Sequence, residues 1–415
     1  MTTAALEDLG RRAVGASRVL AGASTAAKDQ ALRLSAELLE QRAAEVLSAN
    51  AEDLSRARAE GAGDTQLDRL GLSEDRIGSM AEGLRQVAGL PDPVGEVVGG
   101  GLRPNGLRVE RVRAPLGVVG IIYENRPNVT SDAGGLCLKA GNATMLRGSS
   151  SALESNRVVA GALRDGLAKA GLPADGVVLV EDTSREAAVA FMQLEGVVDC
   201  LIPRGGHSLI EAVRRHATVP VVIDGDGNCH VYVDASADLD MALAIVVNAK
   251  TQRPGVCNAA ESLLVHRQVA EAFLPRAAEA LEGVELVGDE RARAVVPSMG
   301  VATDEDFATE FLALKLSVGV VDDLEGAMAH IDRFGSGHSE AIVTADLRSA
   351  ERFCREVDAA AVVVNASTRF VDGGELGLGA EIGISTQKLH ARGPMGLREL
   401  TCVKYLVHGD GQVRR

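Results

Sequence analysis

The sequence predicts an α/β protein with two doubly wound α/β domains and a small β element that pairs subunits. Two series of short apolar runs alternate with helical segments, the first between residues 117 and 223 and the second between residues 230 and 364. Such alternation is typical of mostly parallel sheets covered by helices. With 415 residues, the chain is long enough for two or three domains with sizeable cores.

Residues 4–90 are predicted to form helices. Apolar residues recur at helical spacing in 32–39 and 44–47, and charged residues occupy the opposite face. Pro91 and Pro93 end this helical region.

A hairpin is predicted for residues 98–113, because glycines and alternating apolar and charged residues flank the turn at 104–106. A two-stranded ribbon has too little core of its own to be stable, so we expect it to pair subunits. Residues 401–408 are predicted to form a final strand that extends a neighbouring sheet.

The alternating region supplies the two sheets. The predicted strands of the first series are 117–122, 143–146, 177–180, 198–202 and 220–223, with helices at 150–169, 184–192 and 207–216. The predicted strands of the second series are 230–233, 262–265, 317–321, 341–344 and 361–364. The expected domains are 1–97 with 114–224, then 225–375, and a pairing element of 98–113 with 376–415.

The composition excludes several classes of protein. A formal net charge of −15 argues against a general nucleic-acid binder, which would carry a basic stripe. No apolar run approaches the roughly 20 residues of a membrane helix, and the first residues carry acids instead of a signal-type apolar core. The six cysteines are scattered without a Cys-x-x-Cys pair, so neither a metal site nor a disulfide framework is expected. We expect a cytoplasmic protein.

Cys257 is the most informative residue, because it lies in a Gly/Pro turn just before the apolar run 262–265. Attack on an acyl carbon needs a soft nucleophile on a sharp, exposed turn, with backbone N–H groups available to bind the oxyanion. A buried structural cysteine is the competing interpretation, since free cysteines are often buried.

A second segment supplies complementary chemistry. Asn125 lies in a polar turn between the apolar run 117–122 and the helical stretch 130–140. At the carboxyl edge of a parallel sheet, where α/β proteins place ligand groups, its amide could donate to a developing oxyanion. An ordinary Asn turn is the competing interpretation, and the presence of the cysteine favours the functional one.

Two nucleotide-binding motifs are absent from the sequence. There is no G-x-G-x-x-G after a strand and no G-x-x-x-x-G-K-S/T. A dinucleotide, if one is used, must therefore bind without either glycine pattern.

These segments, together with the strand 141–147 and Glu310, resemble the aldehyde dehydrogenase superfamily, and within it the γ-glutamyl phosphate reductase family. Phe334 departs from the last matching motif, in which the family has a polar-edged side chain before the glycine. The resemblance implies an aldehyde-dehydrogenase-like fold with a cofactor-binding domain followed by a catalytic domain that carries the cysteine. The matching motifs cover nearly the whole chain and are 68–70, 90–95, 122–130, 255–259 and 327–344.

The resemblance assigns the catalytic residues. Cys257 is expected to be the nucleophile and Asn125 an oxyanion donor, with the backbone N–H of Cys257 as the second donor. The other five cysteines are expected to be buried packing residues.

The resemblance also implies a cofactor site. Glu310 is similar to the glutamate that holds the nicotinamide ribose hydroxyls, although the phenylalanine two residues later in relatives is Leu312 here. Gly205 and Gly206 match a turn that opens a helix, whose N-terminus would face the cofactor's pyrophosphate. Arg147 stands where the superfamily often has a lysine near the adenosine ribose, and a guanidinium there suits a 2′-phosphate, so NADPH is expected over NADH. A solvated strand-end arginine is the alternative at that position.

Arg126 and Arg369 are the candidates for binding the anionic groups of the substrate, because both lie in turns predicted near a sheet edge. The alternative for each is a solvated loop arginine. His338 and Glu340 match the family signature, and either a structural hydrogen-bonding role or a substrate contact suits them.

The implied function is NADPH-dependent reduction of a small molecule, L-glutamyl 5-phosphate, to L-glutamate 5-semialdehyde and phosphate through a cysteine thioacyl intermediate. This reaction is the second step of proline biosynthesis from glutamate. Hydrolytic aldehyde dehydrogenases carry a water-activating glutamate in a Glu-Leu-Gly-Gly pattern, and the matching stretch 222–228 has none, although Asp224 lies close to that position.

Two other functions compete with this one. A non-phosphorylating NAD(P)-dependent aldehyde dehydrogenase is the alternative, and the missing glutamate counts against it. A non-catalytic protein is disfavoured because Cys257 and Asn125 are both present. We expect a homodimer or homotetramer that associates functionally with a separate glutamate 5-kinase, since the chain begins directly with reductase-like helices.

Overall fold

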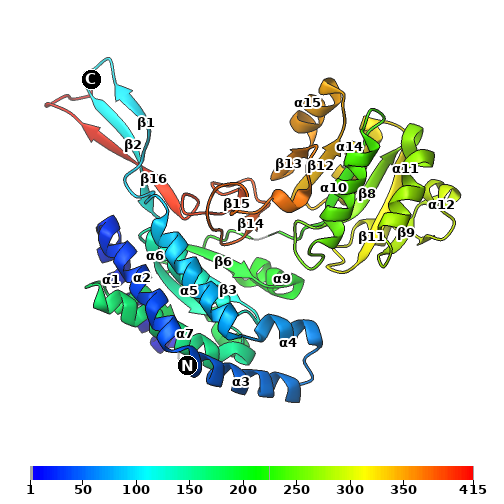
Figure 1. Cartoon of the computed structure of the whole chain (residues 1–415). Coiled ribbons are helices and arrows are strands. Elements are labelled where there is room, and N and C mark those ends of the chain that lie inside the picture. Colours follow the sequence, from blue (N-terminus) through cyan, green and yellow to red (C-terminus); the bar gives the residue numbers. More distant parts are fainter. Residues whose placement is uncertain (1–2, 224, 415) are drawn as a thin grey trace. The chain divides into compact units, whose positions relative to one another are not determined.

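The computed structural model describes residues 3–223 and 225–414, which fall into two compact units. The first unit contains the described residues up to Ile223, together with Leu378–Gly383 and the segment from Met395. The second unit contains residues 225–377 together with Ile384–Pro394. Each unit has its own parallel sheet (Figure 1). None of the described helices is long and apolar enough to cross a membrane.

The N-terminal region is helical, as predicted, and serine side chains start two of its helices. Ser24 accepts a hydrogen bond from the N–H of Ala27, and Ser73 accepts one from the N–H of Arg76. The helices are α1 (Thr3–Leu20), α2 (Thr25–Gln41), α3 (Ala43–Ala59), α4 (Asp64–Leu70) and α5 (Glu74–Gly89).

Four parallel strands form the sheet of the first unit in the order β5-β4-β3-β6. Ile122 pairs with Arg147 and Tyr123 pairs with Arg204, so the carboxyl ends of β3, β4 and β6 meet at one edge. The strands are β3 (Val118–Tyr123), β4 (Ala143–Arg147), β5 (Val177–Leu179) and β6 (Cys200–Arg204). The helices are α6 (Asn128–Lys139), α7 (Leu153–Lys169), α8 (Arg185–Met192) and α9 (His207–His216), with short 3₁₀ turns η1 (Ser150–Ala152) and η2 (Ala174–Gly176).

The prediction of a fifth strand at 220–223 is wrong. Val221 makes only an isolated parallel bridge to Leu201. Pro220 has no N–H to donate, so the ladder does not extend.

Seven parallel strands form the sheet of the second unit in the order β10-β9-β11-β8-β7-β12-β13. All five predicted strands are present, and the two that the sequence did not reveal, β9 and β10, are short. The strands are β7 (Cys229–Val233), β8 (Ala260–His266), β9 (Glu285–Gly288), β10 (Gly300–Val301), β11 (Lys315–Val321), β12 (Ser339–Val343) and β13 (Ala361–Val364). The helices are α10 (Leu239–Thr251), α11 (Arg267–Ala280), α12 (Glu290–Val295), α13 (Asp304–Phe307), α14 (Leu324–Phe334), α15 (Leu347–Glu356) and the 3₁₀ turn η3 (Thr368–Phe370).

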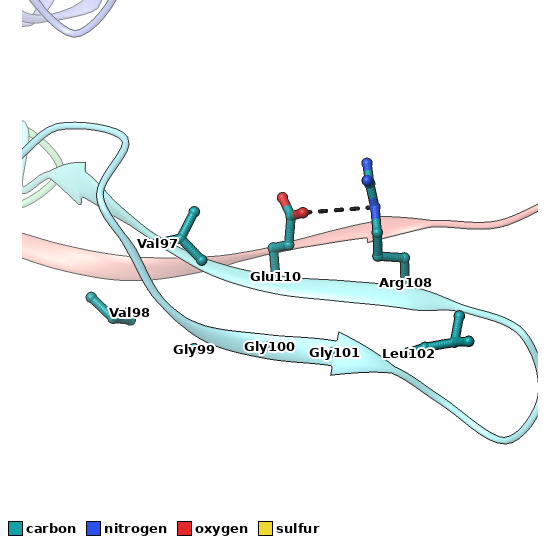
Figure 2. A pocket seen from close by; sticks show the side chains of 8 residues that line it. All are labelled: Val97, Val98, Gly99, Gly100, Gly101, Leu102, Arg108 and Glu110. Carbon is teal, nitrogen blue, oxygen red and sulfur yellow. Dashed lines mark ion pairs between the residues drawn. The ribbon is translucent and has the colours of Figure 1, made fainter.

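The predicted hairpin is β1 (Val97–Leu102) and β2 (Arg108–Pro115), and the predicted final strand is β16 (Thr401–His408). The three strands form one antiparallel sheet in the order β1-β2-β16. Figure 2 shows the surface pocket of about 510 Å³ along the hairpin, where Arg108 and Glu110 form an ion pair at 3.6 Å. Two further short strands, β14 (Ile384–Ser385) and β15 (Gly393–Pro394), pair with each other.

Candidate active site

The turn that carries Cys257 joins α10 to β8, and hydrogen bonds anchor it to the segment around η3. The side-chain amide of Asn258 donates to the carbonyl of Val371 at 2.9 Å, and the hydroxyl of Thr368 donates to the carbonyl of Asn258 at 2.7 Å. Cys257 itself is half-buried. The thiol therefore stands on a fixed turn with partial access to solvent.

The other cysteines divide into two groups. Cys137, Cys200 and Cys229 are buried, and burial raises the pKa of Cys137 and Cys200 to about 12 and that of Cys229 well above its ordinary value. These thiols stay protonated at neutral pH. The expectation of burial is wrong for Cys354 and Cys402, which are exposed because the polar helix α15 and the open strand β16 carry them.

Gly227 connects Cys257 to Glu310. A Cβ on Gly227 would lie 1.6 Å from the carbonyl oxygen of Cys257, so the two backbones touch. The N–H of Gly227 donates to Oε1 of Glu310 at 2.8 Å. The structure thus brings the expected nucleophile and the expected ribose-binding glutamate to one short stretch of backbone in the second unit.

Arg369 lies beside the same turn. Its Nε donates to Oε1 of Gln252 at 2.8 Å. Burial lowers the pKa of Arg369 and the positive charge of Arg253 lowers it further, whereas Asp372 and Cys257 raise it. The guanidinium groups of Arg253 and Arg369 therefore lie within electrostatic range of one another, and a thiolate on Cys257 would interact favourably with Arg369. No role was predicted for Gln252 and Arg253, and their only signal is their position just before Pro254.

Asn125 lies in the turn after β3, in a left-handed conformation with φ of 28°. Its side-chain oxygen accepts hydrogen bonds from the hydroxyls of Ser149, at 3.0 Å, and Ser151. Because both hydroxyls bind the oxygen, the amide NH₂ is left as a donor. The two serines were missed; their signal is the Gly-Ser-Ser-Ser run that follows β4.

The turn of Gly205 and Gly206 opens α9, as expected, but a carboxylate of the chain itself lies there. Oε2 of Glu124 accepts a hydrogen bond from the N–H of Gly206 at 3.0 Å, and a Cβ on Gly205 would lie 2.8 Å from the same oxygen. This helix N-terminus therefore binds an anionic oxygen, which is the chemistry a pyrophosphate needs. Glu124 lies within the matching motif 122–130, but no role was predicted for it.

Arg147 and Arg126 also belong to the first unit. Nη2 of Arg147 donates to the carbonyls of Thr183, at 2.6 Å, and Ser184, at 2.8 Å, and burial lowers the pKa of Arg147. Part of its donor capacity thus holds the loop before α8. Arg126 is half-buried in the turn after Asn125, and its carbonyl accepts the N–H of Val129.

Comparisons with known proteins agree with this architecture. The model of the aldehyde dehydrogenase family matches residues 4–314. A γ-glutamyl phosphate reductase of Moorella thermoacetica is 56% identical over 408 residues, covering 98% of each chain. One of Syntrophomonas wolfei is 55% identical over 411 residues, covering 99% of this chain and 98% of the relative. The chain belongs to the γ-glutamyl phosphate reductase family. A crystal structure of the γ-glutamyl phosphate reductase of Thermotoga maritima has a TM-score of 0.97 at 48% identity, covering 99% of this chain and 100% of that one.

Two residues of the motif shared with the γ-glutamyl phosphate reductase family are fully buried. Glu340 accepts a hydrogen bond from the N–H of His230 at 2.8 Å and pairs with its Nδ1 at 2.9 Å. His338 Nδ1 lies 2.8 Å from the hydroxyl of Ser339. These contacts favour the structural role for both residues. Phe334, the departure from the motif, packs against the ring of His330 at 4.7 Å.

The position at which hydrolytic aldehyde dehydrogenases activate water is occupied differently in this member of the γ-glutamyl phosphate reductase family. Asp224 lies outside the described residues. Asn228 is buried, and its side-chain amide donates to the carbonyls of Phe307 and Phe334, each at 2.7 Å. Asn228 therefore uses its side-chain amide to bind backbone carbonyls.

Proposed function

We propose that this protein reduces L-glutamyl 5-phosphate to L-glutamate 5-semialdehyde and phosphate with NADPH, and that Cys257 is its nucleophile. This reaction is the second step of proline biosynthesis from glutamate. The observation that carries the proposal is a half-buried thiol on an anchored turn, within electrostatic range of Arg369, in a member of the γ-glutamyl phosphate reductase family.

Cys257 attacks the acyl carbon, and the phosphate group leaves from a tetrahedral intermediate. The amide of Asn125 and the backbone N–H of Cys257 stabilise the oxyanion of that intermediate. The bonds from Ser149 and Ser151 support this role for Asn125, because they engage its side-chain oxygen as an acceptor and leave its NH₂ group to donate. The resulting thioester is reduced, and the thiohemiacetal collapses to release the semialdehyde and the thiolate.

NADPH, when bound, supplies the hydride that reduces the thioacyl carbon. Glu310 would hold ribose hydroxyls, and the N-terminus of α9 at Gly205 and Gly206 would bind the pyrophosphate after Glu124 has turned aside. Support for the second assignment comes from the carboxylate that already accepts the Gly206 N–H. Arg147 would bind the 2′-phosphate through those guanidinium N–H groups that do not donate to the loop before α8.

Arg369 and Arg126 would bind the anionic groups of the substrate, with Arg253 beside Arg369. Two guanidiniums near the thiol favour both the thiolate and an anionic substrate. The hydrogen bond from Nε of Arg369 to Gln252 supports this assignment, because it fixes the plane of the guanidinium.

We assign residues 1–97 and 114–224 to cofactor binding, 225–375 to the chemical step, and 98–113 with 376–415 to assembly of a cytoplasmic homodimer or homotetramer. The sheet β1-β2-β16 supports the last assignment, because Leu102 and Tyr405 are 74% and 64% exposed on it. A separate glutamate 5-kinase would supply the labile acyl phosphate.

The test follows NADP⁺ reduction with glutamate semialdehyde, with and without phosphate, in the wild type and in Cys257→Ala. We expect turnover that requires phosphate and disappears in the variant. Equal turnover without phosphate would instead identify a non-phosphorylating aldehyde dehydrogenase, in which water accepts the acyl group.

A further inference from the structure

Lys250 and Glu261 form a buried ion pair that closes the turn of Cys257. Lys250 belongs to the last turn of α10, seven residues before the cysteine, and Glu261 to β8, four residues after it. Lys250 Nζ lies 2.5 Å from Glu261 Oε2, and both side chains are 0% exposed. The pair therefore joins the two ends of the segment on which the thiol stands.

Such a pair is expensive in free energy. Burial raises the pKa of Glu261 to about 7 and lowers the pKa of Lys250, so the interior disfavours both charges. Apolar side chains of similar volume often stabilise a protein as well as a buried ion pair does, or better. The presence of this ion pair is therefore better explained by the geometry that it imposes on the turn than by the stability that it adds.

The second oxygen of Glu261 reaches the segment of Glu310. Oε1 accepts the N–H of Leu312 at 3.2 Å. Leu312 has φ of 53°, a left-handed conformation that is strained for a non-glycine residue and persists only when its surroundings hold it. Two residues earlier, Glu310 accepts the N–H of Gly227, whose backbone touches the carbonyl of Cys257.

We propose that Glu261, paired with Lys250, is a positioning residue for the reaction. One carboxylate oxygen holds the turn of Cys257 through Lys250, and the other holds the segment of Glu310 through Leu312. A single side chain thereby fixes the nucleophile and the ribose-binding glutamate in one geometry. This inference rests on the proposed function, in which Cys257 and Glu310 have those roles.

The test compares the double variant Lys250→Met/Glu261→Gln with the wild type. The double variant removes both charges and leaves no buried ion unpaired, so its Tm should stay near that of the wild type. The methionine side chain cannot donate a hydrogen bond across the turn, so kcat should fall about 10- to 100-fold. The control is Lys139→Met/Asp29→Asn, which removes a Lys–Asp pair of 2.5 Å in the first unit and should leave kcat unchanged.

A second readout needs no substrate. Alkylation of Cys257 by iodoacetamide is followed peptide by peptide, with the exposed thiols of Cys354 and Cys402 as internal references. In the double variant, the rate at Cys257 should change about threefold or more while the reference rates stay the same. This readout remains informative if the wild type shows no phosphate-dependent turnover, so failure of the proposed function and failure of this inference are distinguishable.

Wild-type kcat and a wild-type alkylation rate in the double variant would show that the pair is only structural. If the double variant does not fold, Glu261→Asp decides the question, because it keeps the charge but cannot reach both partners. Glu261→Asp should lower kcat about 10-fold or more. An Asp variant with normal kcat would contradict it.

Discussion

A methyl group on Gly227 would lie 1.6 Å from the carbonyl oxygen of Cys257 and 2.6 Å from its Cα, so only glycine fits there. A methyl group on Gly255, two residues before Cys257, would lie 3.9 Å from its nearest neighbour, the carbonyl oxygen of Leu312. The two glycines of one site therefore have different physical roles. The first permits a close backbone approach, and the second has room for a side chain.

Gly227→Ala should lower kcat/KM about 100-fold, because the backbone of Cys257 must move. It should also lower the free energy of unfolding by about 1–3 kcal/mol through overpacking. Gly255→Ala is the matched control and should keep nearly wild-type kinetics. Steady-state kinetics and urea unfolding measure both effects, and equal loss in the two variants would show that the contact at Gly227 is not decisive.

Asn125→Ala should reduce kcat about 10²- to 10³-fold, the usual effect of losing one oxyanion donor. Ser151→Ala should reduce kcat less, because Ser149 still binds the oxygen of Asn125. The control is Ser150→Ala, since Ser150 is exposed in the same run. Kinetics with saturating substrate measure these losses. If Asn125→Ala raised only KM, the role of Asn125 would be substrate binding.

At the scale of elements, the sheet β1-β2-β16 has an unusual surface. Gly100 has φ of 154°, and a Cβ there would lie 2.3 Å from the carbonyl oxygen of Val109, so glycine lets β1 cross β2 closely. Tyr405 and Val407 of β16 are 64% and 56% exposed. Exposed apolar side chains on an open edge strand are typical of a surface that pairs with another chain.

The double variant Tyr405→Asp/Val407→Asp should lower the oligomeric mass in solution, because charge on both residues opposes burial in a subunit interface. Light scattering coupled to size exclusion measures the mass. Leu347→Asp is the control, since Leu347 is 71% exposed on α15. An unchanged mass in the double variant would place the subunit interface elsewhere.

At the scale of the whole molecule, the sequence predicted the sheets because buried parallel strands appear as continuous apolar runs. It did not predict β9, which has four residues and begins with a glutamate, or β10, which has only two residues. Strands as short as these give no periodic signal in the sequence. The nucleophile's turn was predictable from local glycine and proline. The contacts of Asn125 with Ser149 and of Glu124 with Gly206 were not, because they span 24 and 82 residues and depend on the fold.

Acid stability is a property of the whole molecule that His330 should influence. Burial, with smaller contributions from His230 and Arg333, lowers the pKa of His330 to about 3. The unfolded chain binds a proton at the ordinary histidine pKa of about 6.5, so folding stability is lost as the pH falls from about 6.5 towards 3.

His330→Phe should therefore gain stability relative to the wild type as the pH is lowered from 7 to 5. Urea unfolding at the two pH values measures the difference, with His408→Gln, an exposed histidine of β16, as the control. A difference between His330→Phe and the wild type that did not change with pH would mean that His330 binds its proton equally well in the folded and the unfolded chain.

The proposed reaction passes through a thioacyl enzyme on Cys257, which phosphate, and not water, discharges. The most direct measurement is mass spectrometry of the enzyme after incubation with glutamate semialdehyde and NADP⁺ without phosphate. We predict a glutamyl adduct on the Cys257 peptide that persists in buffer and disappears when phosphate is added. An adduct on another residue, or one that buffer removes as fast as phosphate does, would contradict the proposed role of Cys257.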